Sequence, residues 1–161
     1  MVCLTLAPVA DGRPGRMYNA LSSKVAFDNL EDSLSGALNV YPTLAAAVQV
    51  TCHSDAYTYG SYTEVVPAST ITGDFFLESI QIEEVSGTDA FQVSVGTGTA
   101  ASETEVAVAR AYFPHTSYTG PRVIPIRKRI DANTRIAVRA ANSSAASALI
   151  VHVSITYRLV S

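Results

Sequence analysis

The clearest feature of the sequence is a period-two alternation of apolar and polar residues that begins near residue 60. It is strongest in the segment 74–84, whose four large apolar residues change phase halfway along. These residues are Phe75, Leu77, Ile80 and Ile82. A β-bulge near Glu78 and Ser79 would bring all four to one face of a strand. We therefore predict a long strand that contains a bulge at its centre.

Six further segments show a strand pattern and are separated by Gly, Ser, Thr, Asn and Pro. We expect strands over residues 62–66, 90–95, 106–108, 123–130, 135–140 and 149–157. Residues expected to face inward include Phe91, Val93, Val95, Ile124, Ile126, Ile130, Ile136 and Val138, and those expected outside include Gln92, Ser94, Ala137, Ser154 and Thr156. Pro121 and Pro125 indicate that the segment 123–130 is an edge strand, because proline lacks the N–H that a central strand needs.

Many short strands at near-regular spacing are typical of a sandwich or a barrel. The pattern predicts an all-β fold, an antiparallel β-sandwich of about eight strands in a jelly roll, over residues 44–161. Residues 1–43 are less regular and are predicted to form an N-terminal arm or extension. The sequence GRPG at residues 12–15 suits a turn or hinge, and residues 17–38 have weak helical spacing, so this part is interpreted as a short helix or an extended arm.

Composition narrows the class of protein. The chain has 161 residues, of which 48% are hydrophobic and 16% are charged, so it is not a disordered chain. Its apolar runs are too short to span a membrane, and the apolar start has no basic region typical of a signal peptide. The two cysteines, Cys3 and Cys52, form neither a disulfide framework nor a zinc motif.

Charge is distributed unevenly along the chain. Residues 1–105 carry 13 acidic and 3 basic groups, whereas residues 106–161 carry 1 acidic and 8 basic groups. The chain as a whole has a net charge of −3, so nucleic acid is not the expected partner. Arginine outnumbers lysine by 9 to 2, and its planar fork suits ion pairs at protein interfaces.

Four arginines on the predicted strands are the candidate protein-interface residues. They are Arg127, Arg129, Arg135 and Arg139. Because their apolar neighbours are expected to point inward, their own side chains should point out. Their half of the chain offers only Asp131 as a counter-charge, so their partners are acids of residues 1–105, of a sister subunit or of another protein. We expect a homo-oligomer, most simply a trimer, because closed symmetry satisfies complementary charge.

A second candidate is a ligand loop rich in aromatic residues. Its members are Tyr57, Tyr59, Tyr62, His115 and Tyr118. Aromatic faces pack against sugar rings, although the chain contains no tryptophan, and tyrosines that pack on a neighbouring strand explain the same pattern.

The rest of the sequence contains no recognisable dinucleotide, metal or catalytic site. Residues 96–101 fit the glycine spacing of a dinucleotide site, but no βαβ unit or acidic residue follows at the required distance, so a hairpin loop is expected. The three histidines are far apart and have no paired ligands, so no metal is predicted. The adjacent glutamates lack the setting of a catalytic pair. We therefore expect no catalytic residue and no cofactor, and the chain is not predicted to be an enzyme.

The order of several short motifs resembles small tailed-phage virion proteins that have a β-sandwich domain. The motifs are GSYTEVV at residues 60–66, DFFLESI at 74–80, VGTG at 95–98, ASET at 101–104, IPI at 124–126 and NTRIAVR at 133–139. The group includes capsid decoration, or cement, proteins, and the likeness covers about 100 of the 161 residues.

The resemblance implies a structural role on the capsid surface of a virion, after synthesis in the host cytoplasm. The implied partners are the major capsid protein and other copies of this chain, often as a trimer. A tail or fibre component that recognises host glycans through the tyrosine-rich loop is the alternative. A stand-alone β-sandwich enzyme or ligand carrier is a third hypothesis.

Overall fold

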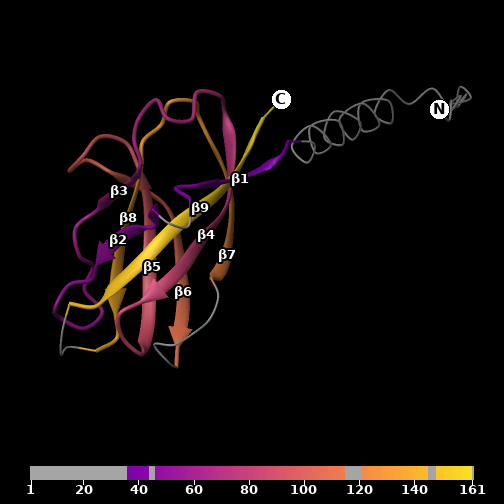
Figure 1. Cartoon of the computed structure of the whole chain (residues 1–161). Coiled ribbons are helices and arrows are strands. Elements are labelled where there is room, and N and C mark those ends of the chain that lie inside the picture. The colour runs from indigo at the N-terminus through magenta and orange to yellow at the C-terminus, as the bar shows by residue number, and fades with distance from the viewer. Residues whose placement is uncertain (1–35, 44–45, 115–120, 145–147, 161) are drawn as a thin grey trace, which may run out of the picture.

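The computed structural model describes residues 36–43, 46–114, 121–144 and 148–160, which form an all-β unit. In these ranges the strands are β1 (Leu38–Tyr41), β2 (Val48–Thr51), β3 (Thr63–Val66), β4 (Phe75–Val85), β5 (Asp89–Thr97), β6 (Thr104–Phe113), β7 (Arg122–Ile130), β8 (Ile136–Asn142) and β9 (Ile150–Leu159). They form two antiparallel sheets that pack face to face (Figure 1). The predicted all-β sandwich is therefore confirmed.

The strand pairing is nested in the way that defines a jelly roll. β2 pairs with β9, β3 with β8, β4 with β7 and β5 with β6, always antiparallel. Pairing of β4 with β9 and of β5 with β8 joins these hairpins into two sheets. The first sheet has the order β1-β9-β4-β7, with β2 also on β9, and the second has the order β3-β8-β5-β6. Eight strands, β2 to β9, make the predicted jelly roll.

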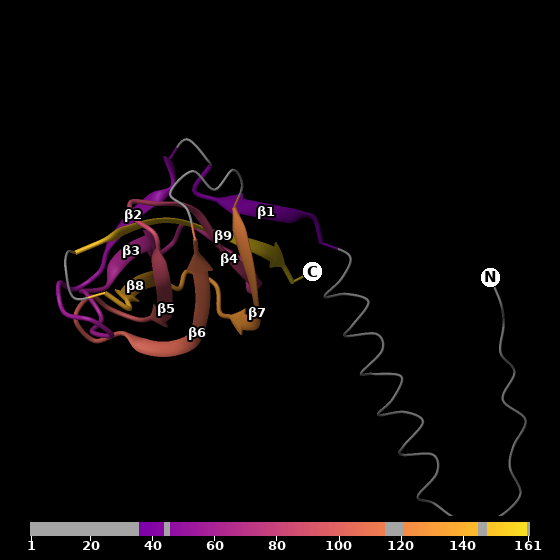
Figure 2. The same cartoon turned by 90° about the horizontal axis from the view of Figure 1, so that it is seen from below.

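β1 is an additional strand beside this jelly roll. It pairs with residues 155–158 of β9, whereas β2 pairs with residues 150–153 of the same strand. Figures 1 and 2 both show β1 at the rim of the sandwich, beside the C-terminal end of β9. β1 lies within the segment 1–43 that the sequence assigns to the arm, so the first sheet includes four residues of that segment. The predicted hinge at residues 12–15 and the helical spacing from residue 17 lie outside the described residues, apart from residues 36–38.

The bulge predicted in β4 is confirmed. The register of β4 against both β7 and β9 shifts between Leu77 and Ser79. Phe75, Leu77, Ile80 and Ile82 are all fully buried, so the extra residue restores the inward phase after Leu77.

The core lies between the inner faces of the two sheets. The first sheet contributes aliphatic side chains of β4 and β9, and the second contributes Phe91, Val93 and Val95 of β5. Phe91 packs edge-on against Phe113 of β6, with ring centroids 5.8 Å apart. This geometry suits aromatic rings, whose edges are positive and whose faces are negative.

Some residues on outward positions are nevertheless buried. Ser94, Ala137, Ser154 and Thr156 were expected outside, but each is 0–2% exposed. The predicted faces are correct, because Ser94 lies opposite Arg139 on the outer face of the second sheet. Longer side chains nevertheless cover these small residues. Ser154, for example, donates a hydrogen bond to Glu83 of the neighbouring strand β4 at 2.6 Å, and its hydroxyl oxygen lies 3.2 Å from Gln81 Oε1 of the same strand. The edge position of β7 and the hairpin at residues 96–101, between β5 and β6, agree with the predictions.

Candidate functional site

The candidate site is the outer face of the sheet β3-β8-β5-β6, where the loop between β2 and β3 crosses it. The backbone N–H groups of Tyr57 and Gly60 donate to the carbonyls of Asn142 and Ala140. The loop therefore runs along β8 before β3 begins. Gly60 is required here, because a Cβ at this position would lie 2.2 Å from the carbonyl oxygen of Thr51. The loop thereby places its tyrosines over the sheet.

Two of these tyrosines enclose Arg139 of β8. The guanidinium carbon of Arg139 lies 4.4 Å from the ring centroid of Tyr59 and 4.6 Å from that of Tyr62. A cation between two aromatic faces is stabilised by the negative potential of both rings. Tyr62 also lies on Gly96, where a Cβ would meet its ring at 2.9 Å. The faces that Tyr59 and Tyr62 turn toward Arg139 are therefore occupied by a side chain of the same chain.

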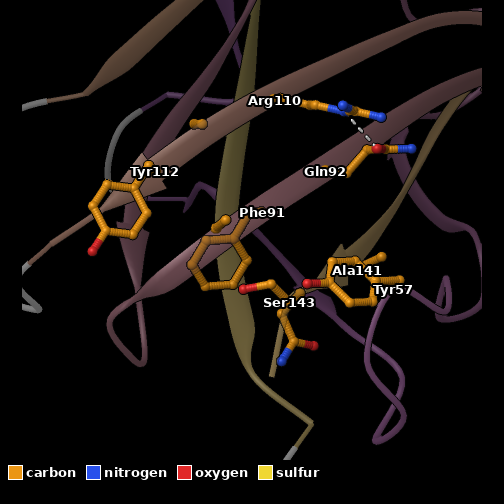
Figure 3. Close-up of a pocket in the computed structure, with 10 residues that line it drawn as sticks. Tyr57, Phe91, Gln92, Arg110, Tyr112, Ala141 and Ser143 are labelled. Atoms are coloured by element: carbon orange, nitrogen blue, oxygen red, sulfur yellow. Dashed lines mark hydrogen bonds between the residues drawn. The ribbon is translucent and has the colours of Figure 1, made fainter. Parts of the chain in front are cut away.

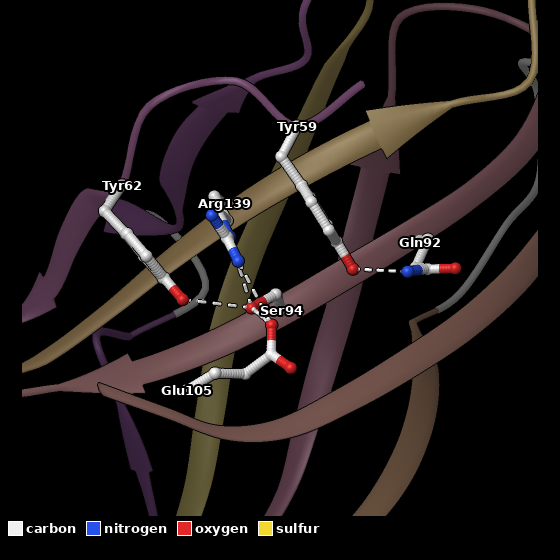
Figure 4. A network of polar contacts seen from close by, with 6 residues as sticks. All are labelled: Tyr59, Tyr62, Gln92, Ser94, Glu105 and Arg139. Carbon is white, nitrogen blue, oxygen red and sulfur yellow. Dashed lines mark hydrogen bonds and ion pairs between the residues drawn. The ribbon is translucent and has the colours of Figure 1, made fainter. Parts of the chain in front are cut away.

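The polar network beneath Arg139 is centred on Ser94 (Figure 4). Ser94 Oγ donates to Glu105 Oε2 at 2.6 Å and lies 3.1 Å from Tyr62 Oη. Since Ser94 has only one hydroxyl proton, Tyr62 is the donor in the second contact. Arg139 donates to Glu105 Oε2 at 3.2 Å. The Ser94 hydrogen bond and, secondarily, Arg139 lower the pKa of Glu105 against the opposing effect of burial.

Arg135, which directly precedes β8, forms a second, more buried network on this face. Its Nε donates to Glu64 at 2.6 Å and its Nη1 donates to Glu103 at 2.8 Å. The side chain of Arg135 is 13% exposed and that of Glu103 is 5% exposed. The hydrogen bond from Arg135 lowers the pKa of Glu103. Burial alone would lower the pKa of Arg135, but its bonds to Glu103 and Glu64 outweigh burial and raise it.

A pocket of about 370 Å³ opens beside these networks, between Tyr57 and Tyr112 (Figure 3). Its lining is formed by Tyr57, Ala90, Phe91, Gln92, Arg110, Ala111, Tyr112, Ala141, Asn142 and Ser143. Gln92 joins the pocket to the Arg139 network, because its amide donates to Tyr59 Oη while its oxygen accepts from Arg110 Nε at 2.7 Å. The two tyrosines at the pocket are strongly exposed, Tyr57 by 79% and Tyr112 by 63%.

One end of the pocket is fixed by the buried carboxylate of Asp89. It accepts hydrogen bonds from the Ser143 hydroxyl, the Ser144 N–H at 2.9 Å and the Ala90 N–H at 2.7 Å. Burial opposes ionisation, but these hydrogen bonds outweigh it and lower the pKa of Asp89 to about 2. Burial in turn raises the pKa of the nearby Cys52 thiol to about 12, with a smaller contribution from Asp89, so this thiol is no nucleophile.

The four predicted interface arginines do not share one surface. Arg127 and Arg129 lie on β7 of the first sheet, whereas Arg139 lies on β8 of the second and Arg135 directly precedes that strand. Arg129 pairs with Asp74 at 2.9 Å, and the pKa of Asp74 is lowered first by the Ala132 N–H and then by Arg129. Three of the four therefore meet acids of residues 1–105 within the chain, which was one of the predicted alternatives. Binding of these arginines to another subunit stays a prediction.

The predicted ligand loop is brought together in part. Tyr57, Tyr59 and Tyr62 lie over one sheet face, but only Tyr57 lines the pocket. His115 and Tyr118 lie outside the described residues. Sequence reasoning missed Gln92, Arg110 and Tyr112. Arg110 and Tyr112 alternate with alanines in β6, which was a usable signal, but their neighbours on β5 follow only from the strand register.

Across the described residues, no group of three or more His, Cys, Asp and Glu side chains is placed to hold a metal ion. Nor does any helix in these ranges have the length and apolar character needed to cross a membrane.

No protein-family model matches the chain, and no curated protein matches it. A function for this chain is therefore inferred from its residue pattern and from the geometry of the site.

Proposed function

We propose that this chain is a non-enzymatic structural protein of a virion, which decorates and stabilises a phage capsid. In this proposal it is made in the host cytoplasm and binds the outer capsid surface as a homotrimer, through contacts with the major capsid protein and with its own copies. The mechanism is burial of apolar surface at specific interfaces, each of roughly 1,200–2,000 Å² for a stable contact.

The observation that carries this proposal is the apolar face of the edge strand β1. Leu38 is 58% exposed and Val40 is 46% exposed, whereas Tyr41 of the same strand packs against the core. Leu38 and Val40 alternate on the outward face of β1, in register with Arg158 and Thr156 of β9. Exposed aliphatic side chains on an edge strand favour contact with another protein.

The position of β1 also suits an attachment role. This strand lies at the end of the first sheet, and it connects the jelly roll to the N-terminal segment that the sequence predicts to be an arm. An arm that begins at β1 would reach neighbouring capsid subunits from the same edge that carries Leu38 and Val40. Jelly rolls are also common in viral capsid proteins, which agrees with the proposal at the level of fold.

The test is a double substitution, Leu38→Ser with Val40→Ser, in a capsid co-sedimentation assay. Burial of each aliphatic side chain contributes roughly 1.5–3 kcal/mol, so we expect at least about a tenfold loss of affinity for capsids of the phage that encodes the chain. Val123→Ser is the matched control, because Val123 is 57% exposed on β7 at the other edge of the same sheet. Unchanged binding by a folded double variant contradicts this attachment surface.

A tail or fibre component that recognises glycans is the second candidate function. It is favoured by the pocket beside Tyr57 rather than by the β1 edge. An image of the intact particle with the density of this protein located distinguishes the two. Density on the capsid lattice supports decoration, and density on the tail alone contradicts it.

A further inference from the structure

The pocket between Tyr57 and Tyr112 has the form of a small-molecule site. Its volume of about 370 Å³ lies within the range of roughly 300–1,000 Å³ that is common for ligand pockets. Figure 3 shows the two tyrosines on opposite sides, with Arg110 and Gln92 along one margin and Ser143 along another. The small residues Ala90, Ala111 and Ala141 also line it and leave room for a ligand.

Tyr57 is held at the pocket by its backbone. Its φ of 59° is left-handed, a conformation that is unfavourable for a bulky residue. The hydrogen bond from its N–H to the carbonyl of Asn142, at 2.8 Å, fixes this conformation. Tyr57 is 79% exposed, so the chain maintains an unfavourable backbone conformation at an aromatic residue that it does not bury.

Arg110 differs from the other arginines of this face in its partner. Its Nε donates to the neutral amide oxygen of Gln92, and no carboxylate among the described residues forms an ion pair with it. Gln92 is itself bonded to Tyr59, which restricts its rotation. Arg110 therefore presents a positioned cation at the margin of the pocket, and the remaining guanidinium donors suit a bidentate contact with a carboxylate.

The polar groups of the pocket have capacity left for hydroxyl groups. The Ser143 hydroxyl donates to Asp89, so its oxygen remains able to accept a hydrogen bond. The Gln92 amide uses one of its two N–H groups on Tyr59. Two exposed aromatic rings suit the C–H faces of a saturated ring, and the mixture of donors and acceptors suits ring hydroxyls.

From these groups together, we propose that the pocket binds an acidic sugar, with the pyranose ring between Tyr57 and Tyr112 and its carboxylate on Arg110. A hexuronic acid, free or as a unit of an acidic polysaccharide, has this chemistry. The inference goes beyond the proposed capsid role and applies equally to a protein of the capsid or of the tail. Of the tyrosines that the sequence predicts to contact a sugar, only Tyr57 belongs to this pocket. Tyr59 and Tyr62 pack on Arg139 instead.

The test is a titration of the full chain with D-glucuronic acid, followed by NMR chemical shifts. We expect saturable binding with a Kd on the order of 1 mM, and roughly tenfold weaker binding of D-glucose and of the glucuronic acid methyl ester, which lack the carboxylate charge. The shifted resonances should belong to residues that line the pocket. Absence of saturable binding by the wild-type chain, or equal binding of all three sugars, would overturn the proposal.

Three variants resolve the roles of the side chains. Arg110→Gln should weaken glucuronic acid binding by roughly tenfold and leave glucose binding unchanged, because only the charge contact is lost. Tyr112→Ala should weaken binding of both sugars. Val108→Ala is the matched control, since Val108 lies four residues away on the same face of β6 and outside the pocket. Thermal unfolding confirms that each variant is folded.

Acetate and inorganic phosphate are the last probes, because each tests for an anion site without sugar recognition. We expect both to bind much more weakly than glucuronic acid. Acetate binding as tight as that of glucuronic acid, with no effect of Tyr112→Ala, would identify a carboxylate site for acidic peptides instead. Preferred binding of phosphate would identify a phosphate site. Either result overturns the assignment to a sugar, and neither depends on the position of the chain in a particle.

Discussion

Two regions of the same sheet face differ in the partners that they give to arginine. At the start of β8, Arg135 contacts two carboxylates, and within the strand Arg139 lies between two aromatic rings and beside a third carboxylate. On β6, Arg110 contacts a neutral amide at the margin of a pocket. Arg135 and Arg139 connect distant segments of their own chain, whereas the donors that Arg110 does not use remain available to a ligand.

This difference separates stabilising residues from binding residues. A buried cation without its carboxylate is strongly unfavourable, so the acids around Arg135 are required by the fold itself. An exposed cation that contacts only an amide contributes little to the fold, so its fixed position needs another explanation. The predicted interface role is therefore weaker for Arg135, whose charge is already satisfied, than for the exposed Arg127 of β7.

The largest expected effect is on stability, in the comparison of Arg135→Ala with Arg110→Ala. Loss of Arg135 leaves Glu103, with 5% of its side chain exposed, without its cation. We expect the Tm and the free energy of unfolding to fall more than for any other substitution proposed here. Arg110→Ala should change stability by less than about 0.5 kcal/mol, as is usual for surface positions.

Urea unfolding of both variants beside the wild type measures this difference. Arg135→Lys is the control that keeps a charge while losing the forked geometry, and it should be intermediate. Equal stability of the two alanine variants would show that the contacts of Arg135 contribute no more to stability than those of Arg110. The contrast between the two regions would then have no basis.

The second effect concerns Asp89, which anchors the end of the pocket. Its pKa of about 2 in the folded chain lies below its ordinary value of 3.8, so its contribution to stability is present above about pH 4 and is lost as the pH falls through about 2. The shift corresponds to about 2 kcal/mol. Glu103, Glu105 and Asp74 also have lowered pKa values, so they reduce stability in the same direction at low pH.

The difference between wild type and Asp89→Asn isolates this contribution. The free energy of unfolding should differ between the two proteins by about 2 kcal/mol more at pH 5 than at pH 2. Cys52 stays protonated throughout this range, because its pKa is about 12, so it does not contribute to the pH dependence. A constant difference at all pH values would show that the Asp89 hydrogen bonds do not depend on its charge.

Much of the fold was predictable, because period-two patterns report the face on which each residue lies. The bulge in β4 followed from the phase change between Leu77 and Ile80, and the edge position of β7 followed from its prolines. The pattern does not report what covers an outward position. Ser94 and Ser154 therefore lie on the predicted faces but are buried by side chains from neighbouring strands and from the loop between β2 and β3.

The site was predictable only in part, for a related reason. The tyrosines of the loop were visible as a local cluster, so Tyr57 was found. The partners that define the pocket are distant in sequence: Gln92 and Arg110 meet through the β5–β6 register, and Arg139 meets Ser94 across 45 residues. Such pairs depend on strand register, which a bulge changes, as between Val95 and Gly96. The unequal charge of residues 1–105 and 106–161 predicted that arginines of the second part would pair with acids, either of the first part or of another chain. It did not predict which acid each arginine would contact.

A smaller effect is expected at the junction of the two regions, from Gly96→Ala. The added Cβ would meet the Tyr62 ring at 2.9 Å, so the ring must move away from Arg139 and Ser94. Because the ring is the far end of a flexible side chain, we expect a loss of about 1 kcal/mol rather than unfolding. Sugar binding should be retained, because Tyr62 does not line the pocket. Loss of binding would show that the two regions are coupled.

The smallest expected effect is that of Glu105→Gln, which removes the charge opposite Arg139. The two side chains are 42% and 31% exposed, and exposed ion pairs contribute less than about 1 kcal/mol. The amide oxygen of glutamine still accepts from Ser94, so no buried donor is left without a partner. The stability difference should shrink further in 1 M salt, since screening acts on exposed charges. Arg139 keeps both tyrosine rings in this variant, so it should stay in place. A loss as large as that of Arg135→Ala, and insensitive to salt, would instead mean that Arg139 is desolvated between its rings and belongs with the buried network.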